Sequence, residues 1–145
     1  MLTDTGPLIA LLDKRQHLHQ ACRRVFENAD LPLITTWPCF TEAMYFAQRE
    51  GGQRFQDILW RFVSDRILRI HHSQIPTHTD DAEEQFRDRM RELMEQYADL
   101  PMDLADASLV AVAEQLNLRQ IFTLDRRDFI IYRTREGAAF EVVPD

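Results

Sequence analysis

Four acidic residues, far apart in the sequence, carry the strongest signal for chemistry. Asp4 ends the short apolar stretch "MLTDTG", Asp125 follows "RQIFTL", Glu42 lies in "PCFTEAMYFAQRE", and Asp106 lies in "DLADASLVAVAEQL". Carboxylates gathered in one cleft repel each other, so at neutral pH they need protons or cations. Hard divalent cations bind carboxylate oxygen, and a bound ion can activate water for attack on a phosphodiester. The chemistry indicated is metal-assisted hydrolysis.

The elements that must position these acids alternate between short strands and helices. The apolar patterns and their Gly and Pro boundaries predict strands over 1–6, 31–36, 66–71, 119–124 and 139–143. Helices are predicted over 7–14, 18–29, 38–50, 55–63, 79–97 and 103–116. Strands separated by helices indicate parallel pairing with right-handed crossovers. We therefore predict one domain over residues 1–145, an α/β/α sandwich of three layers with a central, mainly parallel sheet of about five strands.

This fold predicts that the four acids meet. In open parallel sheets, ligands bind outside the carboxyl ends of the strands, near the point where the strand order reverses. Asp4 ends the first strand and Asp125 the fourth, whereas Glu42 lies in the first turns of the helix after the second strand. Asp106 lies in the first turn of the buried helix before the fourth strand. All four therefore converge on one edge of the sheet.

Each acid also has a purely structural explanation. Asp103 precedes Asp106 by three residues at a helix start, where we favour helix capping for Asp103 and function for Asp106. Asp4 could serve the following turn, Asp125 could cap the short "RRDF" turn, and Glu42 could be an ordinary helical acid. Four such coincidences at one predicted edge are less plausible than one shared site.

The segments that hold the acids resemble a known family. "LTDTGPLIALLD", "TEAMYFA", "PMDLADASLVAVA" and "FTLDRRDF" are similar, in order, to the four acidic motifs of PIN-domain ribonucleases. The resemblance runs through essentially the whole chain and is closest to the toxin subunits of VapBC toxin–antitoxin pairs. It implies an endoribonuclease that depends on Mg²⁺ or Mn²⁺, cleaves structured RNA and is held inactive by a small antitoxin.

The resemblance also assigns residues, motif by motif. It implies that Thr5 and Thr123 support the acids through their hydroxyl groups, and that Gly6 replaces a Ser or Thr found in many relatives. An aromatic-rich set in the second and third helical segments fits the core, and any exposed remainder could receive an antitoxin helix or a second subunit of a homodimer. The acids implied at the metal site are Asp4, Glu42, Asp106 and Asp125, which are also the catalytic candidates, with Asp103 as a fifth metal ligand.

Composition limits the function without deciding it. The formal net charge of −7 argues weakly against non-specific binding of nucleic acid, which needs cations at the phosphates. Of the 17 basic residues, however, only Lys14 is lysine, and arginine is the better bidentate phosphate ligand. The sequence shows neither a membrane-spanning stretch nor a secretory signal, and Cys22 and Cys39 are predicted to be buried free thiols. These features predict a cytoplasmic protein without a membrane partner.

Other protein classes fit less well. A phosphoacceptor domain of the receiver type needs a lysine near the last strand, and Lys14 is at the wrong end. A phosphatase with a nucleophilic Asp usually shows Asp-x-Asp, and four scattered glycines cannot form a dinucleotide-binding loop. The alternative that remains is a catalytically inactive PIN-like module acting through protein or RNA contacts. Such a protein would usually have lost one of the four acids, so their presence favours the enzyme.

Overall fold

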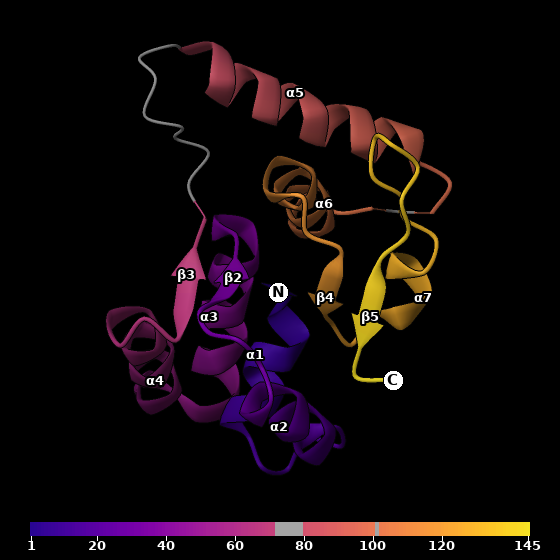
Figure 1. Cartoon of the computed structure of the whole chain (residues 1–145). Coiled ribbons are helices and arrows are strands. Elements are labelled where there is room, and N and C mark those ends of the chain that lie inside the picture. Colours follow the sequence, from indigo (N-terminus) through magenta and orange to yellow (C-terminus); the bar gives the residue numbers. More distant parts are fainter. Residues whose placement is uncertain (72–79, 101) are drawn as a thin grey trace.

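A five-stranded parallel sheet forms the centre of the protein (Figure 1). The structure, a computed structural model, describes residues 1–71, 80–100 and 102–145. The strands pair in the order β3-β2-β1-β4-β5, and each of these pairs is parallel, which confirms the predicted sheet. The strands are β1 (Leu2–Thr3), β2 (Leu33–Thr35), β3 (Leu68–Ile70), β4 (Gln120–Phe122) and β5 (Glu141–Val143).

Helices cover both faces of the sheet, as predicted for an α/β/α sandwich. Figure 1 shows α5 and α6 on one side of the sheet and α1 to α4 on the other. The described helices are α1 (Thr5–Leu12), α2 (His19–Glu27), α3 (Trp37–Gly51), α4 (Gln53–Ser64), α5 (Asp80–Gln96), α6 (Leu104–Leu116) and α7 (Arg126–Phe129).

Each face of the sheet has its own hydrophobic core. On the first face, α6 is buried along most of its length and packs with side chains such as Leu2, Ile121 and Leu93. Its apolar sequence predicted this central position. On the second face, Phe40 and Leu59 pack with side chains of α1 and the strands. Burial on both faces explains why β1 and β2, in the interior of the sheet, are buried at every position, whereas the edge strand β3 exposes Arg69 between Leu68 and Ile70.

Local signals in the sequence set the ends of the helices that carry the acids. The Thr36 hydroxyl accepts a hydrogen bond from the backbone N–H of Cys39, 3.4 Å away, which begins α3. Gly52 ends α3 with φ at 63°, and Asn117 ends α6 in the left-handed conformation predicted for it. Helix α1 begins earlier than predicted, at Thr5 rather than Pro7, because the Asp4 carboxylate caps it.

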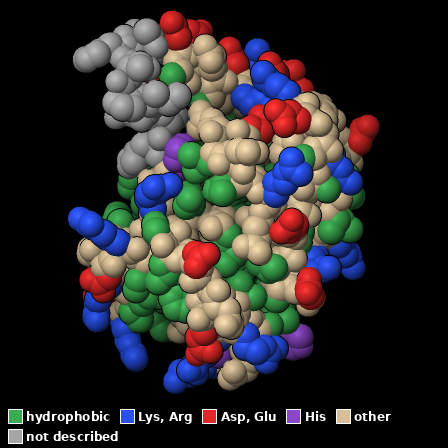
Figure 2. All heavy atoms as spheres, in the orientation of Figure 1, with side chains coloured by type: hydrophobic (Ala, Val, Ile, Leu, Met, Phe, Trp, Pro, Cys, Tyr) green, Lys and Arg blue, Asp and Glu red, His purple; other side chains and the backbone are tan. Residues whose placement is uncertain are grey.

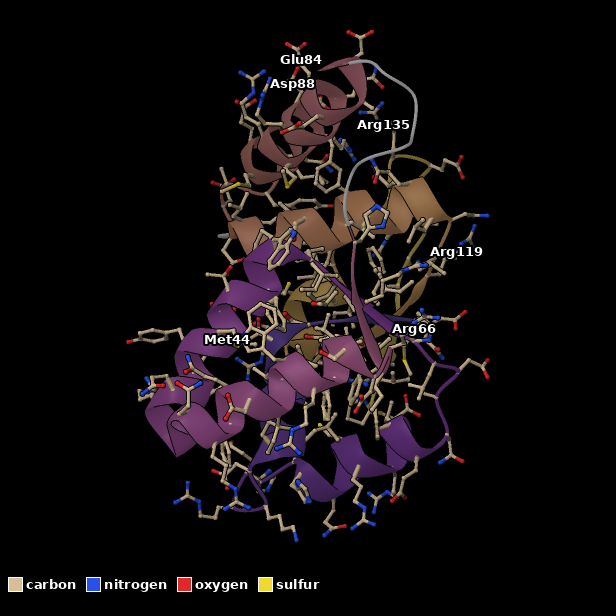
Figure 3. The ribbon with its side chains drawn as sticks, turned by 90° about the vertical axis from the view of Figure 1, so that its left-hand side faces the viewer. Met44, Arg66, Glu84, Asp88, Arg119 and Arg135 are labelled. Atoms are coloured by element: carbon tan, nitrogen blue, oxygen red, sulfur yellow. The ribbon has the colours of Figure 1, made fainter. Side chains whose placement is uncertain are left out.

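Helix α5 is fixed on α6 by an ion pair. The Arg89 guanidinium donates two hydrogen bonds to the carboxylate of Glu114, at 2.9 and 2.8 Å. The backbone N–H of Arg135 donates to the same carboxylate, at 2.6 Å. Figure 3 shows Glu84 and Asp88 on the outer side of α5, away from α6. The inner side of α5 thus supports the helix that carries Asp106.

Several large apolar side chains remain at the surface. Figure 2 shows hydrophobic side chains at the surface, with basic and acidic side chains around them. In the predicted aromatic set, Phe40 is buried, whereas Trp37, Tyr45 and Trp60 are 44%, 64% and 46% exposed. Both cysteines are buried free thiols, as predicted. Within the described ranges, no helix combines the length and the apolar character needed to cross a bilayer.

Candidate active site

A cavity of about 500 Å³ opens at the carboxyl ends of β1 and β4. The strand order reverses there, because the chain passes from β1 to β2 and β3 on one side and returns to β4 on the other. This is the position where open parallel sheets bind ligands. All five acids singled out in the sequence line this cavity. Its lining residues are Asp4, Thr5, Gly6, Ile9, Gln16, Glu42, Phe46, Asp103, Ala105, Asp106, Leu124 and Asp125.

Asp4 is fixed by neutral hydrogen-bond donors. Its Oδ1 accepts from the backbone N–H of Thr5 at 2.6 Å, and its Oδ2 accepts from the Thr123 hydroxyl at 2.7 Å. The Cys39 thiol lies 3.9 Å from Oδ1. Burial raises the pKa of Asp4 to about 6, although the bonds from Thr123 and Thr5 act in the opposite direction. The carboxylate is therefore rigid but incompletely stabilised as an anion.

Asp106 is held by a tyrosine. The Tyr132 hydroxyl donates a hydrogen bond to Oδ2 of Asp106 at 3.1 Å. Burial, followed by the negative charges of Asp103 and Asp4, raises the pKa of Asp106 to about 7. The Tyr132 bond lowers this pKa without cancelling the rise. Asp106 is thus poised between its protonated and ionised forms near neutral pH.

The other three acids are held more loosely. The exposed Asp103 is the N-cap of α6, and its Oδ1 accepts from the backbone N–H of Asp106 at 2.9 Å, so the capping role favoured from the sequence is present. Asp125 is exposed and its side chain does not cap α7. Burial, then the charge of Asp128, raises the pKa of Asp125. Glu42 is half-buried on α3 and makes no hydrogen bond to the described part of the chain.

The acids share the cavity without compensating cations. None of the five forms an ion pair with any residue in the described ranges. In the same ranges, no three acidic, histidine or cysteine side chains are close enough to form a ready-made metal cage. Their placement is therefore observed, while their role as metal ligands stays a prediction.

The two predicted supporting hydroxyls behave differently. The Thr123 hydroxyl contacts Asp4 and also accepts from the backbone N–H of Asp125 at 2.9 Å, so it joins two acids. The expectation for the Thr5 hydroxyl is wrong, because it donates to the carbonyl of Cys39 at 3.1 Å. Thr5 supports Asp4 through its backbone N–H instead, since Asp4 is the helix cap.

Some residues of the site carry no pattern that the sequence analysis could use. Tyr132 lies in an irregular segment after α7, and Gln16 lies in the loop between α1 and α2. Ile9, Phe46 and Leu124 belong to apolar patterns that equally predict core positions. The position of Leu124, directly before Asp125, was the one available signal that its side chain borders the site.

Comparison with known proteins agrees with the fold. Residues 1–136 match the PIN domain, and the chain belongs to this family. Ribonuclease VapC26 of Mycobacterium tuberculosis is 25% identical over 144 residues, which cover 99% of this chain and 100% of that protein.

Two solved structures show the same fold. The first is VapC20 of Mycobacterium tuberculosis, described as a sarcin–ricin loop cleaving toxin, with a TM-score of 0.73 and 15% identity. That likeness covers 86% of this chain and 89% of VapC20. The second is a chain of a toxin–antitoxin complex from Klebsiella pneumoniae, with a TM-score of 0.65 and 20% identity over 99% of this chain and 95% of that one.

Proposed function

We propose that this protein is an endoribonuclease that hydrolyses RNA phosphodiester bonds with the help of Mg²⁺ or Mn²⁺. The observation that carries the proposal is the convergence of five acids, without ion pairs to the described residues, on one cavity at the switch point of the sheet. An acid cluster without compensating cations favours binding of a divalent ion. Residues 1–145 then form a single PIN-like nuclease domain.

The donor set suits a hard cation. Mg²⁺ is typically held by one or two carboxylates and keeps several waters, so it does not require a complete protein cage. Asp4, Glu42, Asp106 and Asp125 would hold the ion, and Asp103 would have one oxygen left beside its capping bond. When bound, such an ion activates water and stabilises the leaving oxygen of the phosphodiester.

The residues of the chain hold the carboxylates in place for this chemistry. Thr123 and the backbone of Thr5 fix Asp4, and Tyr132 fixes Asp106. Since the pKa of Asp4 is about 6 and that of Asp106 about 7, cation binding near neutral pH displaces protons from this pair. The affinity of the site for the cation should therefore increase as the pH rises from about 6 to about 7.

The relatives support a proposal for the substrate and the partner. VapC26 is named a ribonuclease, VapC20 is a toxin that cleaves the sarcin–ricin loop, and the Klebsiella pneumoniae chain comes from a toxin–antitoxin complex. By extension, this protein acts on RNA in the cytoplasm as the toxin of a type II toxin–antitoxin pair. The exposed Tyr45 and Trp60 offer apolar surface to a cognate antitoxin or to the second copy of a homodimer.

Cleavage assays with controlled metal content test the proposal. Purified protein should cut RNA in Mg²⁺ or Mn²⁺, lose activity in EDTA, and recover it when either ion is added back. Sequencing the ends of RNA cut after brief induction in cells would identify the target. RNA binding without cleavage under all metal conditions would instead support the inactive binding module, and full activity in excess chelator would contradict metal dependence.

A further inference from the structure

We propose that the cavity also holds an unpaired nucleobase of the substrate, packed against Ile9, Phe46 and Leu124 and contacted by Gln16. The subsite rests on the proposed function, because it describes how the same cavity receives a nucleotide. These four residues will be called the base subsite.

The lining of the cavity combines two chemically different kinds of side chain. Beside the acids, Ile9 from α1, Phe46 from α3 and Leu124 after β4 supply hydrocarbon surface from three separate elements. Neither a metal ion nor a phosphate gains from hydrocarbon contacts. A flat nucleobase does, because stacking and apolar packing hold splayed-out bases in RNA-binding proteins. The apolar side chains therefore match the base, and the acidic side chains match the phosphate with its ion.

Gln16 adds a polar group that the fold itself does not use. Its side-chain amide has no hydrogen-bond partner among the residues that the structure describes, although it lines the cavity. An amide offers two donors and an acceptor, which suits the polar edge of a base. A neutral amide also avoids both repulsion from the acids and a permanent ion pair with them. Gln16 is thus suited to discriminate between bases.

The loop that carries Gln16 is rigid. The Asp13 carboxylate accepts hydrogen bonds from the backbone and the guanidinium of Arg15, at 2.9 to 3.2 Å. The backbone N–H of Gln16 donates to the carbonyl of Asp13, and its carbonyl accepts from His19, both at 3.0 Å. Arg15 also donates to the carbonyl of Glu50 at 3.4 Å, which ties the loop to α3. The amide is consequently presented from a fixed backbone.

The apolar and the acidic residues of the lining lie close enough for one nucleotide to contact both. Glu42 and Phe46 are four residues apart on α3, so they share a face, with their Cβ atoms about 5–6 Å apart. Leu124 directly precedes Asp125, so an apolar and an acidic residue of the lining are also neighbours after β4. A base on Phe46 and Leu124 therefore leaves its own phosphate beside the acids.

The size of the cavity agrees with this occupant. Its volume of about 500 Å³ falls within the range of about 300–1,000 Å³ that is typical of small-ligand pockets. The Arg49 guanidinium, which forms an ion pair with Glu50 at 3.1 Å, lies over the Phe46 ring, 5.0 Å from its centroid. A base paired in a duplex is stacked on both faces and cannot enter such a pocket, so the substrate class is RNA with an unpaired nucleotide.

Titration of the full chain with nucleoside 5′-monophosphates and with ribose 5-phosphate, in Mg²⁺ and in EDTA, tests the subsite. Stacking contributes about 1–3 kcal/mol per base, so the nucleotides should bind at least about fivefold more tightly than ribose 5-phosphate. Phe46→Ala should remove most of this difference and leave the affinity for ribose 5-phosphate unchanged. Unchanged ribose 5-phosphate binding also shows that the variant is folded.

Gln16→Ala should reduce the differences in affinity among the four nucleotides. Gln20 is an exposed glutamine on α2, and the control variant Gln20→Ala should leave these differences unchanged. Nucleotides that bind no better than ribose 5-phosphate, or no binding by any of these probes, would overturn the base subsite. Ribose 5-phosphate binding that is the same in Mg²⁺ and in EDTA would contradict the proposed metal site instead. The two proposals therefore fail in distinguishable ways.

Discussion

The phenol of Tyr132 donates a hydrogen bond to Oδ2 of Asp106, and the two residues come from different parts of the sandwich. Asp106 lies in the first turn of α6, whereas Tyr132 follows α7 and is fully buried. The Tyr132 ring also contacts Tyr97 and Phe129 edge-on, with centroids 4.9 and 5.2 Å away. One oxygen of Asp106 is therefore engaged from the core, and the other has no hydrogen-bond partner among the described residues. Tyr132 is a positioning residue for this carboxylate.

Tyr132→Phe should keep the ring packing and remove only this bond. Because the bond lowers the pKa of Asp106, that pKa should rise above about 7 in the variant. A hydrogen bond worth about 1 kcal/mol corresponds to a shift of roughly 0.7 units, so the rising limb of the pH–rate profile should move up by about that amount. Carboxyl NMR titration in EDTA and cleavage assays in Mg²⁺ measure both effects.

Tyr97→Phe is the matched control. The Tyr97 hydroxyl accepts a hydrogen bond from the backbone N–H of Arg133 at 3.0 Å and does not contact Asp106. Like Tyr132→Phe, this variant loses one hydrogen bond, so its free energy of unfolding should fall by about 1 kcal/mol. Its pH–rate profile should stay unchanged. Equal profiles for both variants would mean that Tyr132 is merely structural.

The sequence predicts the architecture because its local and long-range signals agree. Gly and Pro separate the apolar stretches, and α6 is apolar on nearly every side, which only a central helix tolerates. The strand lengths were overestimated: β1 covers Leu2–Thr3 rather than residues 1–6, since Asp4 already caps α1. A residue such as Asp4, which follows a strand and caps a helix, fits the sequence pattern of either element, so the sequence alone does not fix the boundary between them.

The site was most readily predictable where its residues mark the ends of elements. Asp4 and Asp125 interrupt apolar strands, so their types stand out against their surroundings. Tyr132 and Gln16 lie in irregular segments; Tyr132 contacts Asp106 and Gln16 lines the cavity, through positions that have no sequence period. Such contributions depend on tertiary packing of loops, which hydrophobic periodicity does not report.

Asp4→Asn should abolish cleavage that depends on metal without weakening the metal-free fold. Asparagine keeps the size of the side chain and an oxygen that can cap α1, but it removes a negative charge from a crowded site. At pH 7.5 in EDTA, the variant should be as stable as the wild type or slightly more so. Thermal melts in EDTA and RNA cleavage in Mg²⁺ measure these effects, and Asp99→Asn, at an exposed position, is the control.

A destabilised but still active Asp4→Asn protein would contradict this assignment. That result would mean that the carboxylate matters for the helix cap and not for the chemistry. A stable and inactive variant would separate the two roles, because a cap alone does not affect catalysis.

The raised pKa values also predict how the metal-free stability depends on pH. Asp4, with a pKa of about 6, and Asp106, with a pKa of about 7, hold protons in the folded state that the unfolded chain releases near its ordinary pKa of 3.8. The folded state therefore binds more protons between about pH 4 and pH 7, and its stability falls as the pH rises through this window. Because the two carboxylates are coupled, this loss of stability belongs to the pair and not to either residue alone.

Denaturant unfolding in EDTA at a series of pH values measures this slope. Comparison with the double variant Asp4→Asn, Asp106→Asn removes the contributions of other acids, such as Asp13, whose pKa is lowered by the hydrogen bond from Arg15. The wild type should lose stability relative to the double variant as the pH rises, and Mg²⁺ should restore it above pH 7. Parallel pH curves for the two proteins would show that the pKa values of Asp4 and Asp106 are not raised in the folded state.

Gly6 and Leu124 should be energetically coupled. A Cβ atom at Gly6 would lie 3.2 Å from Cγ of Leu124, which is tighter than ordinary contact. The Ser or Thr that the family resemblance leads one to expect at this position therefore does not fit here without movement of Leu124, a residue of the base subsite. Elsewhere in a helix, Gly→Ala stabilises by about 0.5–1 kcal/mol. Gly6→Ala should instead be neutral or destabilising in the wild type and less unfavourable in a Leu124→Ala background, where only the Cβ atom of residue 124, 3.3 Å away, remains close.

A double-mutant cycle measured by denaturant unfolding in EDTA gives the coupling free energy directly. We expect a coupling of about 0.5–1 kcal/mol or more, since the two side chains compete for the same space. Nucleotide titration of the same variants connects the contact to function: Gly6→Ala should displace Leu124 and weaken nucleotide binding, while ribose 5-phosphate binding stays unchanged. Additivity of the two substitutions within about 0.3 kcal/mol would show that Leu124 does not explain the glycine.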